Sequence, residues 1–421
     1  MTISMRVVLV LAAVCGTACA QGGSVLCKVQ DYGAKGDGAT LDTVAIQKAI
    51  DDCAAKAPAW SAGFVELGGA AKFVSGPLVL KSHVTLEIAS GTTLEASTDH
   101  ALFPEIEQFH DKGRQSLLSA TGAEDITIRG GGVIDGRGES WWEHRGKGET
   151  RPRLIVFDHC KHVLMENVTV QNSPMWQIVP YYSEDLTFRN MKVLAPEPAG
   201  HNTDGIDPFS SKHILIEHVL IDTGDDNVAI KSGQPDSAGP DDPSEDITIR
   251  DCDFRLGHGL SVGSEVSGGV KHLRVERVTF KGTTQGIRIK SGRDRGNDVG
   301  DFVYKDITME DVKLPVQITE YYGSPKGVGP ENVGDAPVSR LTPHMHDITI
   351  ENLKATGAKQ AMEIAGLPEA PVKGVRLENV EISAETGAKI AYAQVVSKGL
   401  KVHAASGQAL MVGKGVTGSL K

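Results

Sequence analysis

The chain has 421 residues, of which 54 are acidic and 43 are Lys or Arg, so its formal net charge is −11 at neutral pH. This acidic balance argues against nucleic acid as a partner. It does not exclude an acidic polymer, because salt damps net charge beyond roughly 8–10 Å and a local basic patch can then dominate.

The first twenty residues predict a signal peptide. Arg6 precedes an apolar run at residues 7–14, and the small residues at 18–20 suit cleavage before Gln21. The apolar run is too short to span a bilayer. We therefore expect a secreted protein, extracellular or periplasmic, whose mature chain is residues 21–421.

An amphipathic helix is the next predicted element. Asp42 is placed to cap a helix that continues to about Lys56. One face of this helix carries Ile46, Ala49, Ile50 and Cys53. We expect the helix to cover the N-terminal end of the fold, because the end strands of a stacked structure need protection.

Four cysteines follow the signal peptide: Cys27, Cys53, Cys160 and Cys252. Export permits disulfides, and Cys27 and Cys53 flank one segment, but the sequence alone leaves open whether they pair. Cys160 and Cys252 lie in strand-like runs, where we expect small buried apolar residues. Without a CxxC pair, a structural zinc site is not expected.

Short strand-like runs recur through the rest of the chain. They occupy residues 125–129, 162–170, 185–190, 213–217, 246–250, 272–276, 302–306, 347–352 and 375–380. Starts at 162, 185, 213, 246 and 272 are 23, 28, 33 and 26 residues apart, a period typical of solenoids. Each run alternates apolar and polar residues without a helical period, which predicts an all-β parallel β-helix in one domain, residues 21–421. The Gly- and Pro-rich stretch Tyr321–Thr342 predicts a long loop.

Four unusual segments interrupt the regular runs. They are Asn202-Thr-Asp-Gly-Ile-Asp207, Thr223-Gly-Asp-Asp-Asn227, Gly257-His-Gly259 and Arg288-Ile-Lys290. Their centres are about one repeat apart, and residues one repeat apart stack on the same face of a solenoid. We therefore expect one surface column that holds Asp204, Asp225, Asp226, His258, Arg288 and Lys290.

Glycoside hydrolysis is the chemistry that suits this column. It takes one protonated carboxyl group for the leaving oxygen and one carboxylate for water or the sugar. Keeping all the clustered aspartates ionised costs electrostatic energy, so we expect the pKa of one of them to rise and that residue to act as the general acid. Adjacent strand residues face opposite sides, so Asp225 and Asp226 share a cleft only if the chain bends, which Gly224 permits. For Asp207 we favour the simpler interpretation of an aspartate at a β-helix corner.

Two cations and a histidine complete the column. Arg288 and Lys290 share a strand face and are placed to bind a carboxylate-bearing sugar. His258 beside the aspartates is predicted to tune their protons. Trp141 and Trp142 could stack on sugar rings or pack in the core, and the sequence leaves both interpretations open.

The four motifs, in this order and spacing, resemble the signature of the polygalacturonases, glycoside hydrolase family 28. The likeness also includes Asp31–Gly38 and Ile134–Gly136. The resemblance implies a single-stranded right-handed parallel β-helix that hydrolyses α-1,4-galacturonosidic bonds of pectic galacturonan with inversion and without a metal or other cofactor. Many fungal members have Cys where this chain has Asn227, so a disulfide at that turn is not expected.

The resemblance also implies roles for single residues. Asp225 would be the general acid, Asp204 and Asp226 would activate water, and His258 would support protonation of the acid. The residues implied to bind the galacturonate are Asn202, Arg288, Lys290 and Tyr322, with Tyr321 as the alternative to Tyr322. We expect a monomer with no nucleic-acid or membrane partner.

Three other functions compete with this prediction. The first is a hydrolase of the same family that acts on rhamnogalacturonan or xylogalacturonan. The second is a calcium-dependent pectate lyase, and the third is a non-catalytic polysaccharide-binding solenoid. The motifs do not distinguish endo from exo attack, which depends on whether loops close the ends of the cleft.

Overall fold

The computed structural model describes residues 25–57, 61–109, 111–144, 146–196, 200–235 and 241–420. The predicted signal peptide, residues 1–20, lies outside the described residues. Within the described part, no helix has the length and apolar character needed to cross a membrane.

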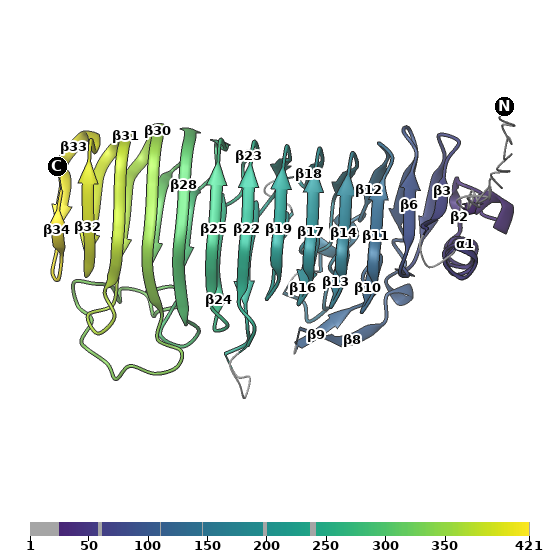
Figure 1. Ribbon diagram of the computed structural model, residues 1–421, viewed down its shortest axis with the longest axis horizontal. Coiled ribbons are helices and arrows are strands. Elements are labelled where there is room, and N and C mark those ends of the chain that lie inside the picture. Colours follow the sequence, from purple (N-terminus) through teal and green to yellow (C-terminus); the bar gives the residue numbers. More distant parts are fainter. Residues whose placement is uncertain are drawn as a thin grey trace, which may run out of the picture.

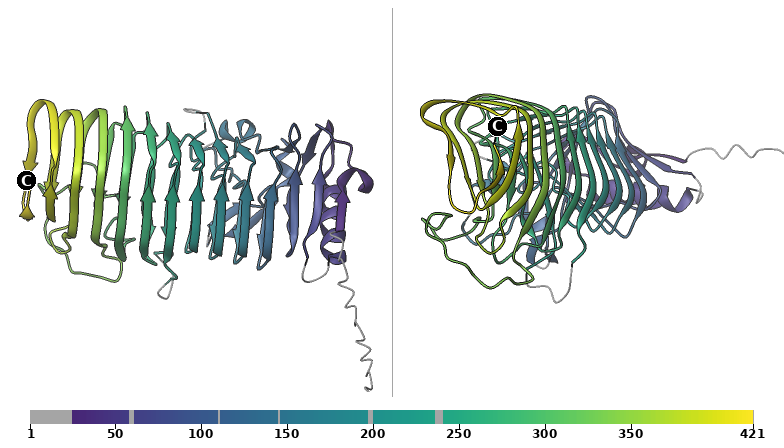
Figure 2. Two further views of the ribbon diagram at one scale, coloured as in Figure 1. Left: turned by 45° about the horizontal axis from the view of Figure 1, so that its top comes forward. Right: turned by 60° about the vertical axis from the view of Figure 1, so that its left-hand side comes forward.

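The chain winds into a right-handed parallel β-helix, as the repeats and the resemblance predicted (Figure 1). Each regular coil adds one strand to each of three long parallel sheets, here named sheets 1, 2 and 3. The coils stack along one axis, with the N-terminal helix at one end and the last strands at the other (Figure 2).

Sheet 1 contains β1 (Val25–Lys28), β3 (Gly63–Leu67), β6 (Val84–Ile88), β11 (Glu124–Arg129), β14 (Lys161–Glu166), β17 (Glu184–Arg189), β19 (Lys212–Glu217), β22 (Ser244–Arg250), β25 (Val270–Glu276), the first parts of β28 (Asp298–Glu310), β30 (His344–Ala365) and β31 (Val372–Ala391), and then β32 (Ala393–Lys398) and β34 (Thr417–Ser419).

Sheet 2 contains β2 (Asp37–Leu41), β4 (Lys72–Ser75), β7 (Thr93–Ala96), β12 (Val133–Asp135), β15 (Thr169–Gln171), β18 (Lys192–Leu194), β20 (Leu220–Asp222), β23 (Asp253–Arg255), β26 (Thr279–Lys281), the middle parts of β28, β30 and β31, and the first part of β33 (Lys401–Val412).

Sheet 3 contains β5 (Leu78–Val79), β10 (Leu118–Thr121), β13 (Ile155–Asp158), β16 (Ile178–Tyr181), β21 (Val228–Ser232), β24 (Leu260–Val266), β27 (Gln285–Lys290), β29 (Leu314–Thr319) and the last parts of β30, β31 and β33. Between β16 and β21, residues 206–209 continue the sheet through single bridges.

The remaining elements lie outside these sheets. They are the 3-10 helices η1 (Val29–Tyr32) and η2 (His100–Leu102), the helices α1 (Thr43–Lys56) and α2 (Glu139–Trp142), and the antiparallel hairpin of β8 (Glu105–Gln108) and β9 (Asp111–Arg114).

Alternation along each strand builds the interior of the solenoid. In β17, for example, Leu186 and Phe188 are buried while the residues between and beside them are not. Leu186 aligns with Ile214 of the next coil, and Ile214 aligns with Ile247. Stacked apolar side chains therefore form one continuous core along the axis, and register is fixed because a one-residue slip would expose them.

Asn and Asp occur at the corners of the coils because of the backbone conformation there. Asn167, Asn190 and Asp251 follow sheet 1 strands, and each has a positive φ between 53° and 56°. Asn and Asp tolerate this left-handed region better than most residues. These residues let the chain turn between sheets 1 and 2 in each coil.

Helix α1 covers the first coil, and its buried face is the predicted one, Ile46, Ala49, Ile50 and Cys53. The predicted side-chain cap is wrong. The carboxylate of Asp42 does not cap α1 but accepts hydrogen bonds from the backbone N–H groups of Lys35 and Gly36, at 2.7 and 3.0 Å. Asp42 thus fastens the preceding loop to the start of the helix.

The cysteines resolve the question that the sequence left open. Cys27 and Cys53 form a disulfide between β1 and α1. Cys160 and Cys252 are free and buried, as predicted, and burial raises the pKa of these thiols to about 11 and about 12. The predicted long loop is also confirmed, since residues 320–343 between β29 and β30 contain no helix or strand.

Candidate active site

The aspartates of the predicted column lie where the chain enters the strands of sheet 3. Gly224 lies at the bend before β21, and only a glycine fits there because a Cβ would collide with the carbonyl oxygen of Gly200. Gly257 has φ +61° and lies against the carbonyl of Asp225. The N–H of Gly205 donates to the carbonyl of Asp226 at 3.0 Å, so the segment with Asp204 stacks directly on the segment with Asp225 and Asp226.

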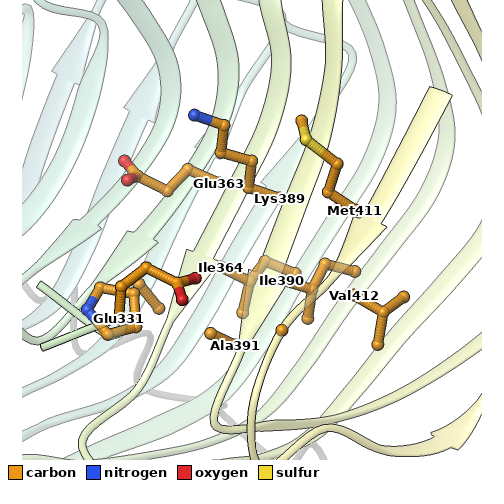
Figure 3. A pocket seen from close by; sticks show the side chains of 11 residues that line it. Glu331, Glu363, Ile364, Lys389, Ile390, Ala391, Met411 and Val412 are labelled. Carbon is orange, nitrogen blue, oxygen red and sulfur yellow. The ribbon is translucent and has the colours of Figure 1, made fainter. Parts of the chain in front are cut away.

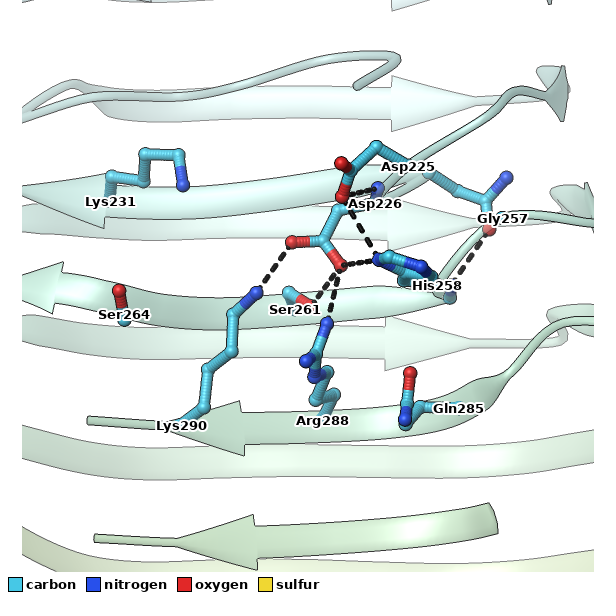
Figure 4. Close-up of polar contacts among 12 residues, drawn as sticks. Asp225, Asp226, Lys231, Gly257, His258, Ser261, Ser264, Gln285, Arg288 and Lys290 are labelled. Carbon is cyan, nitrogen blue, oxygen red and sulfur yellow. Dashed lines mark hydrogen bonds and ion pairs between the residues drawn. The ribbon is translucent and has the colours of Figure 1, made fainter. Parts of the chain in front are cut away.

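Asp226 lies at the centre of the site and is 1% exposed (Figure 4). Its Oδ1 accepts hydrogen bonds from Ser261 Oγ at 2.7 Å and from Arg288 Nη1 at 3.1 Å. Its Oδ2 accepts from Lys290 Nζ at 2.7 Å. Burial raises the pKa of Asp226, but Lys290 and Arg288 outweigh burial and hold this pKa well below its ordinary value.

Asp225 is the more accessible member of the pair, with 20% of its side chain exposed. Its Oδ1 lies 3.0 Å from His258 Nδ1, and its Oδ2 accepts a hydrogen bond from Asn202 Nδ2 at 3.3 Å. Burial raises the pKa of Asp225, but the hydrogen bond and the charge of His258, together with the backbone N–H of Asp226, outweigh burial, and the pKa lies below its ordinary value.

Asp204 carries the raised pKa that the sequence predicted for one member of the cluster. It is 4% exposed, and its Oδ1 has no hydrogen-bond partner among the described residues. Burial raises the pKa of Asp204 well above its ordinary value, and the nearby carboxylates of Asp207, Asp225 and Asp226 raise it further. Of Asp204, Asp225 and Asp226, the carboxyl group that favours a proton in this structure is therefore Asp204 and not Asp225.

Asp207 is not the simple corner residue that we expected. It is fully buried on the bridge segment of sheet 3, and burial raises its pKa although Lys231 counteracts part of the effect. Both of its carboxylate oxygens lack a hydrogen-bond partner among the described residues. The sequence pattern at this position resembled a turn, whereas the fold places the side chain beside Asp204 and Asp226.

Arg288 and Lys290 extend from β27 on the same face, as predicted, but both are engaged by Asp226. Tyr322 follows β29, and its ring centre lies 5.1 Å from Lys290 Nζ and 5.7 Å from the Arg288 guanidinium carbon. Tyr321 instead donates its hydroxyl to the carbonyl of Gly366. Tyr322 is thus the tyrosine that adjoins the two cations.

Lys231 and Glu265 belong to the same charged cluster, and sequence reasoning missed both. Lys231 is 6% exposed in β21, and its Nζ lies 3.4 Å from Glu265 Oε2. Burial raises the pKa of Glu265, but Lys231, the hydrogen bond with Ser264 and the charge of Lys290 together outweigh burial, and this pKa falls to about 2. A lysine after the apolar run Val228–Ile230 was the available signal, since a charged residue in a buried strand requires a partner.

Two groups among the described residues have the chemistry of a metal site. They are His83 with Glu124 and Asp125 on sheet 1, and Asp225 with Asp226 and His258 in the site. In the second group, both oxygens of Asp226 already accept hydrogen bonds from cations, so an ion there would compete with Arg288 and Lys290.

The two tryptophans that the sequence left open have different positions. Trp141 is 1% exposed and stacks on the His100 ring at 3.5 Å, so it packs in the core. Trp142 is only partly buried and donates its indole N–H to the carbonyl of Ser173 at 3.1 Å.

A parallel β-helix with one ionised, one accessible and one proton-favouring aspartate defines a hydrolase of the carboxylate type. The sequence matches the family model of glycosyl hydrolases family 28 over residues 65–404, and residues 26–65 match the model "Rhamnogalacturonase A/epimerase, pectate lyase-like". A probable polygalacturonase from Vitis vinifera is 33% identical over 375 residues, covering 85% of this chain and 74% of the relative.

A bacterial relative and a solved structure agree with this match. An endo-polygalacturonase from Pectobacterium carotovorum is 33% identical over 351 residues, covering 78% of this chain and 84% of the relative. The exopolygalacturonase of Thermotoga maritima superposes with a TM-score of 0.78 at 26% identity, covering 92% of this chain and 94% of that one. The chain therefore belongs to glycoside hydrolase family 28, the polygalacturonases, and is a hydrolase of the polygalacturonase type.

Proposed function

We propose that the enzyme hydrolyses α-1,4-galacturonosidic bonds in pectic polygalacturonate with inversion of configuration. The observation that carries this proposal is the contact between a buried catalytic carboxylate, Asp226, and two cations, Arg288 and Lys290. The proposed acid–base residues and carboxylate-binding residues thereby adjoin one another, which suits a sugar that itself bears a carboxylate.

Asp225 is our proposed general acid. It is the most accessible of the three aspartates, and an acid must reach the leaving glycosidic oxygen. Its pKa is low in the free site because of His258. A bound galacturonate would exclude water from Asp225 and bring a second negative charge close to it, and both changes raise the pKa of a carboxyl group.

Asp226 and Asp204 are our proposed groups for water activation. Asp226 is held ionised, so it can accept a proton from a water molecule that attacks the anomeric carbon. The bond from that carbon to the leaving oxygen breaks while Asp225 gives its proton to that oxygen. Asp204, with its raised pKa, would hold and orient the same water through a shared proton.

The galacturonate carboxylate is proposed to bind at Arg288 and Lys290. Arg288 gives Asp226 one hydrogen bond through Nη1, so further N–H groups of its guanidinium are available for a ligand. Tyr322 covers both cations, and Asn202 steadies Asp225. These contacts support roles for Tyr322 and Asn202 in positioning the sugar.

Residues 1–20 are proposed to direct export, after which residues 21–421 act as a single-domain monomer outside the cytoplasm. The Cys27–Cys53 disulfide supports this proposal, because such bonds persist in oxidising compartments.

Digestion of polygalacturonate in excess chelator tests the function. We expect saturated products with new reducing ends, and we expect Asp225→Asn to lose turnover while it still binds the polymer. Ultraviolet-absorbing unsaturated ends would indicate a lyase. Faster cleavage of rhamnogalacturonan or xylogalacturonan than of polygalacturonate would contradict the proposed substrate.

A further inference from the structure

One column of outward-facing residues runs along sheet 3 from the first coils to the last. In register order it consists of Ser119, Val156, Val179, Asp207, Ala229, Ser261, Arg288, Gln317, Glu363, Lys389 and Met411. The charged site occupies the middle of this column. The two halves on either side of it differ in chemistry and in what covers them.

The N-terminal half is covered by protein. Val156 and Val179 point away from the solenoid core, yet they are 1% and 0% exposed. They belong to a second, separate apolar cluster with Phe109, Tyr181 and Phe209. Phe109 lies at the tip of the β8–β9 hairpin, which lies beside β10, β13 and β16 in Figure 1.

The hairpin crosses sheet 3 from one side to the other. Its chain enters before β10, on the side where the strands begin, and Phe109 packs against Tyr181 at the opposite end of β16, with ring centres 4.2 Å apart. The carbonyl of Phe109 accepts a hydrogen bond from the side chain of Gln234, which lies two residues after the end of β21. The hairpin tip therefore contacts both the end of β16 and the segment that follows β21.

A stack of rings and cations fills the space between the hairpin and the aspartates. The Arg153 guanidinium lies 4.1 Å from the Phe109 ring centre and 4.5 Å from that of Trp176. Lys231 Nζ lies 5.2 Å from the Trp176 ring centre. Arg153 and Lys231 are 8% and 6% exposed, so the two cations of the stack are largely closed off from solvent, while Trp176 is partly exposed.

The C-terminal half of the column is open and polar. Gln317 and Glu363 are partly exposed, Lys389 is exposed, and Gln317 donates to Glu363 at 2.8 Å. A cavity of about 460 Å³ lies between these last coils and the long loop after β29, and Lys389 and Glu331 contribute to its walls (Figure 3). Lys389 is three register steps beyond Arg288, or about 14 Å at the usual strand spacing.

We propose that the enzyme attacks galacturonan from a chain end, with that end held against the Trp176 stack and the polymer extending over Gln317 and Glu363 to a distal site at Lys389. This proposal rests on the proposed function. Only about one coil separates the covered Val179 from Asp207, so the closed side of the site has room for one or two sugars. The enzyme therefore releases monomers or dimers, and Lys389 binds a carboxylate of the remaining chain.

Product sizes and viscosity during digestion of polygalacturonate test the closed end. We expect mono- or digalacturonate from the earliest time points, with little loss of viscosity per bond cleaved. A ladder of longer oligomers with rapid loss of viscosity overturns the inference and leaves the proposed function intact. No hydrolysis at all overturns both.

Lys389→Ala tests the distal site, with Lys401→Ala on the exposed part of β33 as the matched control. We expect the KM for polygalacturonate to rise about two- to five-fold in Lys389→Ala, the size typical of one exposed ion pair. The KM for trigalacturonate should not change, because that substrate is too short to reach Lys389. Equal KM values for the polymer in both variants, or equal shifts for polymer and trimer in Lys389→Ala, contradict a distal site.

Discussion

Sheets 1 and 3 are built from the same stacked coils but arrange their charged side chains in opposite ways. On sheet 1, His and Asp alternate in one outward column from His83 to Asp301, and neighbouring coils form ion pairs of 3.1–3.7 Å when the histidines are protonated. A parallel column pairs Glu184 with Lys161 at 2.7 Å and with Lys212 at 3.1 Å. Opposite charges in adjacent coils stabilise stacked strands.

Sheet 3 gathers like charges in adjacent coils. Asp204, Asp207 and Asp226 are all buried there, and each raises the pKa of the others or has its own pKa raised by them. Only Asp226 has two cations in direct contact. Stacked coils can therefore either pair opposite charges, which favours stability, or gather like charges, which shifts their pKa values. The order of charged residues along the column determines which of the two occurs.

Removal of the central charge of sheet 3 should have the largest effect. Asp226→Asn leaves Arg288 and Lys290 buried without their anion, so we expect turnover to fall by about 10³-fold or more and stability to fall by about 2–4 kcal/mol. Activity assays and denaturant unfolding check both. A variant as stable as the parent would show that the two cations do not depend on Asp226.

Removal of Lys290 should have the second largest effect. Lys290→Ala removes a cation that holds the pKa of Asp226 down, so this pKa rises and the acidic limb of kcat/KM moves to higher pH. At pH 5 we expect a loss of about 100-fold on de-esterified polymer and a smaller loss on methyl-esterified polymer. Lys281→Ala on sheet 2 is the matched control. Equal losses on the two substrates would contradict a carboxylate-binding role.

Asp204→Asn should move stability in the direction opposite to Asp226→Asn. The folded-state pKa of Asp204 is raised, so the folded protein holds this proton more tightly than the unfolded chain, and stability falls as pH rises through the raised pKa. The neutral amide avoids this cost at pH 7. We expect activity to be lost while Tm rises by about 1–3 °C at pH 7, with no gain near pH 3. A lower Tm at pH 7 would show that ionised Asp204 is well stabilised.

Glu184→Gln on sheet 1 should have the smallest effect. Hydrogen bonds from Lys161 and Lys212 lower the pKa of Glu184 to about 2, so its contribution is present above the ordinary pKa of 4.5 and is lost as pH falls toward 2. The pairs are exposed, so the loss at pH 7 should be below about 1 kcal/mol, with full activity. Glu378→Gln, at an exposed position of β31, is the control. A loss of several kcal/mol in the free energy of unfolding would mean that this charged column is a main source of the stability of the fold.

Most of the fold could be predicted because each coil repeats the same local pattern. The run at residues 246–250 and its relatives alternate in the same way, and their spacing indicates a solenoid without any long-range information. The proximity of Asp204, Asp225, Asp226 and His258 could be predicted for the same reason, since residues one repeat apart stack on one face.

The rest depended on contacts between distant segments. Lys231 meets Glu265 from another coil, and Asp207 is buried by neighbours that no local pattern shows. The hairpin tip at Phe109 reaches Gln234, which is 125 residues away along the chain. The pKa of Asp204 was equally inaccessible, because it depends on burial and on the order of charges around it.

The role of Asp225 is tested most directly with a substrate that does not need an acid. In an oligogalacturonide that carries a dinitrophenyl group, the dinitrophenolate leaves without being protonated. We expect Asp225→Asn to lose about 10³-fold on polygalacturonate but to keep nearly full activity on this substrate, whereas Asp226→Asn should fail on both. Equal losses of Asp225→Asn on the two substrates would contradict the assignment of Asp225 as the general acid.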